Sequence, residues 1–145
     1  YPCIVLQGTE LCREYRNGYY QPMTLSNAVS LCAQLLALFE EHDISVLRMG
    51  LFSEPGLSGE DYVAGPYHPA FGELVENAIY YKLLLRALDG FENRELVTVF
   101  VAKGMLSKAI GQHKKNVFEL QKAKNIEKIV IKEAYFLEKR AIKAE

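Results

Sequence analysis

The residues best suited to chemistry lie in the segment "SKAIGQHKKNV", residues 107–117. Gly111 is flanked there by the polar side chain of Gln112 and by four groups that can carry positive charge, namely Lys108, His113, Lys114 and Lys115. A glycine lets the backbone approach a ligand closely, and lysines attract phosphates and release counterions. The segment predicts a polyanion site with salt-sensitive, weakly sequence-selective binding, and the alternative is that the turn merely ends a helix.

The distribution of charge agrees with a polyanion-binding second half. Residues 1–90 hold 5 Lys/Arg and 11 Asp/Glu, a net charge of −6, whereas residues 91–145 hold 12 and 7, a net charge of +5. Such contrast is typical of a basic binding module, although solvated lysine faces are commoner. We expect two domains, 1–90 and 91–145, and half of the chain is apolar, which suffices for hydrophobic cores.

Three further residues could face a substrate. Gln7 and Thr9 directly follow a short apolar run, and His68 stands between two prolines in an extended segment. An imidazole can act as acid, base or metal ligand near neutral pH. The structural alternative for Thr9 is that it caps a helix, and for His68 that it is a helix cap or a surface group. For His42, at the end of a polar helix, the structural alternative is stronger still.

The sequence predicts no catalytic residue and no metal ligand. Cys3, Cys12 and Cys32 are odd in number and widely spaced, so we expect buried free thiols rather than a disulfide framework or a zinc site. A nucleophile elbow and phosphate-loop spacing are both missing. No leader or membrane-spanning run is recognisable, which predicts a cytoplasmic protein, and a start without Met inside an apparent strand predicts a fragment.

Apolar periodicity predicts an α/β chain in which strands and helices alternate. The predicted strands cover residues 3–8, 44–52, 95–104 and 126–133. The predicted helices cover residues 9–18, 70–88, 105–111, 115–124 and the tail 134–145. One more predicted helix, the second in chain order, begins at a cap formed by Thr24 or Ser26. Residues 53–59 form a predicted loop. In the second helix the predicted core face comprises Ala28, Val29, Cys32, Leu35, Leu36 and Phe39.

The first 88 residues resemble the C-terminal extension of radical-SAM proteins of the elongator-catalytic-subunit-like and oxygen-independent coproporphyrinogen III oxidase-like type. The matching segments are "YPCIVLQGTEL", "NGYYQP", "SNAVSLCAQLLALFE", "VLRMGLF" and "VAGPYHPAFGELVE". The resemblance implies that residues 3–6 are a late strand of a β/α barrel, with Gln7 and Thr9 at its functional end. It also implies an upstream barrel of the same chain that holds a [4Fe-4S] cluster and S-adenosylmethionine. This chain lacks the C-x-x-x-C-x-x-C triplet for that cluster, so we expect no cofactor here.

Residues from about 95 to 132 resemble a KH domain, in the order strand, short helix, loop, helix and strand. The resemblance implies RNA binding through a G-x-x-G loop, in which Gly111 matches the first glycine and Gln112 and His113 the middle. Lys114 replaces the second glycine, and its Cβ hinders a positive φ. Lys114 and Lys115 could restore phosphate attraction by charge, so an RNA-binding module and a vestigial packing module are equally expected.

These observations together predict an α/β protein made of a radical-SAM C-terminal extension and a small KH-like module. The expected function is an accessory region that supports the barrel and holds a substrate such as tRNA. One alternative is the C-terminal part of a coproporphyrinogen oxidase-like oxidoreductase with a purely structural second module. A second alternative is a non-enzymatic protein-interaction domain.

Overall fold

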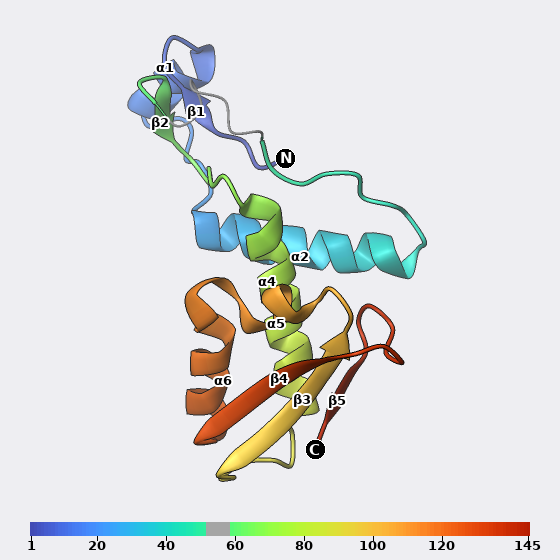
Figure 1. The fold of residues 1–145 in the computed structure, drawn as a ribbon. Helices are drawn as coiled ribbons and strands as arrows, with labels where there is room; N and C mark the ends of the chain where they lie inside the picture. The colour runs from blue at the N-terminus through green and yellow to red at the C-terminus, as the bar shows by residue number, and fades with distance from the viewer. Residues whose placement is uncertain (52–58) are drawn as a thin grey trace. The chain divides into compact units, whose positions relative to one another are not determined.

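The computed structural model describes residues 1–51 and 59–145, which form two compact units, Tyr1–Val75 and Glu76–Glu145 (Figure 1). Helices accompany a two-stranded and a three-stranded sheet, so the chain is mixed α/β, as expected. The predicted loop at 53–58 and the end of the predicted strand at 52 lie outside the described residues. Within the described ranges, no helix is long and apolar enough to cross a bilayer.

The first unit is built around a short antiparallel pair of strands and two helices. Thr9 caps the first helix and Thr24 the second, each with its side chain accepting a backbone N–H bond three residues on, which confirms both predicted starts. The strands pair Val5 with Ala64. In chain order the elements are β1 (Val5–Leu6), α1 (Glu10–Arg16), α2 (Leu25–Glu41), β2 (Tyr62–Ala64) and the start of α4 (Phe71–Ala87).

Two predictions for the first unit were wrong. Residues 44–51 are apolar enough for a strand but form none, because no described strand pairs with them, and Leu47 is almost fully exposed. In α2 the buried side chains are Ala28, Ala33 and Leu36, whereas Leu35 and Phe39 are exposed. The buried stripe is therefore narrower than the apolar stripe of the sequence.

The second unit is a strand, helix, turn, helix, strand arrangement on a three-stranded sheet. The parallel strands β3 and β4 are joined through α5 and α6, and β5 pairs antiparallel with the other edge of β3. The predicted strands and helices between residues 95 and 133 are confirmed. Their bounds are β3 (Leu96–Ala102), α5 (Leu106–Ile110), η1 (Gln112–Lys114), α6 (Lys115–Lys124), β4 (Lys128–Ala134) and β5 (Ile142–Ala144).

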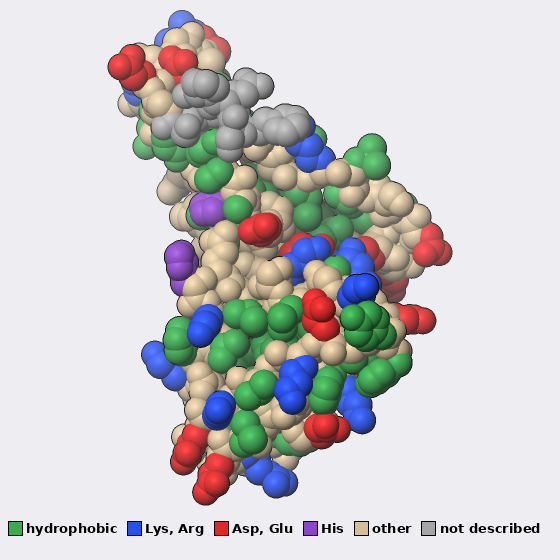
Figure 2. Space-filling view, in the orientation of Figure 1, with side chains coloured by type: hydrophobic (Ala, Val, Ile, Leu, Met, Phe, Trp, Pro, Cys, Tyr) green, Lys and Arg blue, Asp and Glu red, His purple; other side chains and the backbone are tan. Residues whose placement is uncertain are grey.

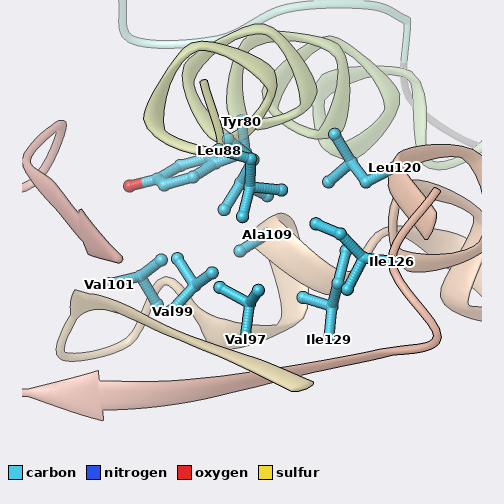
Figure 3. Close-up of a cluster of buried hydrophobic side chains, with 10 residues drawn as sticks. Tyr80, Leu88, Val97, Val99, Val101, Ala109, Leu120, Ile126 and Ile129 are labelled. Carbon is cyan, nitrogen blue, oxygen red and sulfur yellow. The ribbon is translucent and has the colours of Figure 1, made fainter. Parts of the chain in front are cut away.

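Helix α4 supplies much of the core of the second unit. Figure 3 shows side chains of α4 above the valines of β3, with apolar groups of α5, α6 and β4 beside them. Alternate residues of β3 point the same way, which buries one face of the strand. The second compact unit therefore begins within α4, upstream of the expected boundary at residue 90. The buried cluster consists of Tyr80, Leu84, Leu88, Val97, Val99, Val101, Ala109, Leu120, Ile126 and Ile129.

The predicted helix at the C-terminal tail is absent. The tail forms turns and then β5, whose Ile142 and Ala144 pack against the core. Arg140 pairs with Glu76 of α4 at 2.6 Å and lies over the ring of Tyr80, whose hydroxyl donates to the Lys139 carbonyl. The free edge of β3 and these contacts with α4 override the helical propensity of the tail.

Candidate functional site

The structure places the six predicted loop residues around the junction of α5 and α6. Gly111 ends α5 by donating its N–H to the Ser107 carbonyl at 3.0 Å. The turn η1 then follows, in which the Lys114 N–H donates to the Gly111 carbonyl at 3.1 Å. Solvent reaches His113, Lys114 and Lys115 freely, whereas Lys108 and Gln112 are half-buried. The turn therefore presents positive charge at the surface.

Position 111 accommodates only glycine in this conformation. Gly111 has φ 77° and ψ 162°, a region that side chains exclude almost completely. A Cβ would also lie 3.0 Å from Cγ and 3.1 Å from Oδ1 of Asn116, closer than ordinary packing allows. The glycine matched to the first position of the loop pattern is thus required by backbone angle and by packing.

Two consecutive residues with side chains hold left-handed backbone angles in the loop. His113 has φ 51° and Lys114 has φ 59°. We expected the Cβ of Lys114 to hinder a positive φ, and the structure shows that the residue adopts one nevertheless. Each such residue costs about 1–2 kcal/mol. Strain of this kind persists only where the surrounding structure imposes it, and it is concentrated at functional sites.

Asn116 anchors the turn to its neighbours, and its role was missed in the sequence. Its side chain is buried, and Nδ2 donates to the carbonyls of Asn77 at 2.9 Å and Ala109 at 3.1 Å, with Lys108 at 3.5 Å. Carbonyls at the end of a helix lack intrahelical partners, and Asn116 supplies one for α5 while it ties the loop to α4. The sequence signal that could have indicated this role is a polar residue in the first turn of a predicted helix, next to a glycine turn.

The loop keeps a net positive charge in the structure. Lys115 lies 3.7 Å from Glu119, and both side chains are exposed, so this pair is weak and exchanges readily. Lys114 has no acidic side chain within ion-pair distance in the described part of the chain. In the described part of the chain, Lys114 and Lys115 are therefore the two ammonium groups of the turn that remain open to a phosphate.

Gln7 and Thr9 belong to the first unit and are engaged in local hydrogen bonds. The Gln7 carbonyl Oε1 accepts from Arg16 Nη2 at 2.7 Å. Thr9 Oγ1 accepts from the Cys12 N–H at 3.2 Å and donates to the Leu6 carbonyl at 2.7 Å. The capping role expected for Thr9 is thus present. Both side chains are exposed, and a role toward substrate stays a prediction.

The two loop histidines occupy helix ends, as the structural alternative for each predicted. His68 Nδ1 accepts from the Ala70 N–H at 3.0 Å, just before α4. His42 ends α2, with Nδ1 at 2.9 Å from the Leu38 carbonyl. His68 is half-buried, and a role toward substrate is an untested prediction.

The cysteines do not form a metal centre in the described ranges. No group of three or more His, Cys, Asp or Glu residues there is placed to hold a metal ion. Of the three thiols expected to be buried, Cys12 is buried and Cys32 half-buried, and burial raises the pKa of the Cys32 thiol. Cys3, which precedes β1, is exposed, contrary to the expectation.

The fold and the site can now be set beside known proteins. No curated protein and no solved structure gave a match to the chain. The family model for the Radical_SAM C-terminal domain matches residues 1–81. That match covers more than half of the chain, including the whole first unit and the first part of α4. The chain therefore belongs to the radical-SAM C-terminal domain family.

Proposed function

We propose that the chain is the accessory region of a radical-SAM enzyme and has two tasks. The first unit packs against the catalytic barrel, and the second unit holds an RNA substrate such as tRNA through the loop at residues 108–115, in the manner of a degenerate KH module. The observation that carries the proposal is the family match over residues 1–81. The left-handed, lysine-bearing turn supports the second task.

The surface of α2 supports packing against a protein partner. Leu31, Leu35 and Leu38 recur at helical spacing and are 40–48% exposed. Beyond the helix, Leu47 is 97% exposed. Contiguous apolar surface of this kind is typical of protein–protein contacts. Because the family match concerns the C-terminal domain of radical-SAM proteins, the occupant we propose is their catalytic barrel.

The radical chemistry belongs to that barrel in this proposal. A cluster with S-adenosylmethionine would supply it there, and the residues of this chain would position the RNA. The exposed lysines of the turn favour a tRNA-modifying parent of the elongator-like branch over a coproporphyrinogen oxidase-like parent, since a small-molecule substrate would not need a polyanion site.

The loop is tested by tRNA binding across a salt series. Reversing both charges in Lys114→Glu with Lys115→Glu is expected to lower affinity at least tenfold, and to reduce the slope of log affinity against log salt by about one per lysine. The control is Lys82→Glu with Arg86→Glu, which reverses the same number of positive charges at exposed positions on α4. If affinity and slope match those of the unmodified chain, the loop does not hold tRNA.

The barrel contact is tested by co-purification of this chain with the radical-SAM barrel of its proposed parent enzyme. Leu35→Asp with Leu38→Asp should abolish the complex and leave the circular dichroism of the chain unchanged, because both side chains are exposed. A complex that survives both charges contradicts the proposal. The same apolar stripe favours a second candidate function, a non-enzymatic protein-interaction module. A full-length sequence without a C-x-x-x-C-x-x-C motif would favour that module over the radical-SAM proposal.

A further inference from the structure

The three-stranded sheet of the second unit has one face that no helix of that unit covers. Helices α4, α5 and α6 all lie on the side of Val97, Val99 and Val101 (Figures 1 and 3). The alternate residues of β3, Leu96, Thr98 and Phe100, point to the opposite side. Leu96 is 56% exposed, whereas Thr98 and Phe100 are half-buried, so solvent reaches this face in part; it is called the open face below.

The strand register places an aromatic ring between two lysines on the open face. Phe100 is the partner of Lys132 on β4 and of Lys143 on β5. Neighbouring strands lie about 4.8 Å apart, so these three residues form one continuous row across the sheet. At the next outward-facing pairs along β3 and β4, Thr98 stands beside Val130 and Leu96 beside Lys128.

The charge of this face is positive. Lys143 lies 3.5 Å from Glu145, with both side chains exposed, whereas Lys128 and Lys132 have no ion-pair partner in the described ranges. The turn after β4 adds Tyr135, 81% exposed, with Lys103 at 5.0 Å from its ring centroid. Figure 2 shows apolar and basic side chains intermixed over β3, β4 and this turn.

This mixture indicates the class of ligand. A sheet face turned to water normally carries polar residues, so Leu96, Phe100 and Val130 are unusual there. A protein interface would use the apolar groups but is depleted in lysine. Single-stranded nucleic acid uses both, because bases stack on aromatic rings while lysines follow the phosphates.

We propose that the open face of the β4–β3–β5 sheet is a second binding surface for single-stranded nucleic acid. A base contacts the ring of Phe100, and phosphates lie against Lys132 and Lys143. The surface is on the opposite side of the sheet from the helices that carry the Gly111 turn. It does not depend on that turn, so either site can fail without the other.

The test is fluorescence anisotropy of a labelled single-stranded oligouridine with the 145-residue chain, across a salt series. Phe100→Leu keeps an apolar side chain and removes the ring, so affinity is expected to fall about tenfold with the salt slope unchanged. Lys132→Gln with Lys143→Gln is expected to reduce the slope by about 1.4, that is about 0.7 for each phosphate contact. The matched control, Lys82→Gln with Arg86→Gln on α4, should change neither quantity.

The outcomes separate the two sites. If the sheet variants bind normally, or if the unmodified chain binds no oligouridine, the sheet proposal is overturned. If they weaken binding while Lys114→Glu with Lys115→Glu does not, the sheet site stands and oligouridine does not use the loop. Analytical ultracentrifugation of the unmodified chain and of Phe100→Leu completes the test. A dimer of the unmodified chain that Phe100→Leu dissociates would make this face a protein interface and overturn the proposal. Should Phe100→Leu unfold, the lysine pair decides, because both side chains are exposed.

Discussion

The two units of the chain differ in how completely they bury their own apolar side chains. The second unit closes a ten-residue core between α4 and the sheet. The first unit buries a few side chains and leaves large apolar ones in solvent, including Tyr19, Leu38 and Leu47. The contrast is one of degree, since Phe118, Tyr135 and Phe136 of the second unit are also exposed.

Charge follows the same division. Residues 1–75 carry a net charge of −6, and residues 76–145 carry +5. An acidic unit with exposed apolar surface suits a protein partner, whereas a basic unit with a closed core suits a polyanion. The charge contrast agrees with the two tasks proposed above.

The largest expected effect tests the closed core. Leu84→Ala removes a fully buried side chain, and we expect the free energy of unfolding to fall by about 2–5 kcal/mol. The matched change in the first unit is Leu35→Ala, which is 40% exposed and should cost less than about 1 kcal/mol. Urea unfolding followed by circular dichroism measures both, and similar losses would mean that the two units are equally closed.

The next effect tests whether the turn is built into the second unit. Gly111→Ala should lower the free energy of unfolding by about 1–3 kcal/mol, because it strains the backbone and crowds Asn116. Gly104→Ala is the control, since Gly104 has φ 78° but nothing within 4 Å of its added Cβ. A loss at Gly111 no greater than that at Gly104 would show that Asn116 does not support the turn.

A smaller effect of opposite sign comes from the strained lysine. Lys114→Gly should raise the free energy of unfolding by up to about 1 kcal/mol, because glycine adopts φ 59° without strain. Lys115→Gly, one residue on, should lower it by about 1 kcal/mol, since Lys115 has helical angles. Thermal unfolding in parallel checks the pair, and a destabilising Lys114→Gly would refute the strain.

The smallest effect concerns pH. Lys124 donates to Asp89 at 2.5 Å and Glu92 at 2.8 Å, and these bonds raise the pKa of Lys124. The hydrogen bond from Lys124 lowers the pKa of Glu92. The Glu92 contribution to stability is therefore lost as pH falls below about 4.3, and the Lys124 contribution as pH rises above about 10.4.

Comparing Lys124→Gln with the unmodified chain isolates this contribution. The difference in melting temperature should be largest near neutral pH and shrink toward both extremes. Lys115→Gln, which breaks an exposed pair, should show little pH-dependent difference. A difference for Lys124→Gln that is constant with pH would show that the ion pairs contribute nothing.

Local rules predicted much of the second unit and the helix starts of the first. Thr9 and Thr24 were recognisable as caps because a hydroxyl satisfies free N–H groups at a helix start. Helix α6 has the predicted bounds, because its sequence lacks helix breakers and follows a glycine turn. Gly111 was recognisable as the hinge of the loop, and Lys114 and Lys115 are exposed.

Predictions failed where a distant segment decides. Residues 44–51 have strand composition but pair with none of the described strands, and the tail has helix composition but the edge of β3 beside it. The sequence offers only a local hint of the role of Asn116, because its bond to the Asn77 carbonyl joins residues 39 apart. Strand pairing and buried hydrogen bonds depend on what lies alongside in space, which composition does not encode.

The sequence by itself determined most of the alternation of strands and helices and the lysine-bearing glycine turn, because each depends on residues close together in the chain. It also determined the charge contrast, which is a sum over residue types. Only the tertiary structure decided that α4 completes the second unit, that Asn116 holds the turn, and that Phe100 stands between Lys132 and Lys143. The physical reason is that burial and strand register bring together residues far apart in the chain.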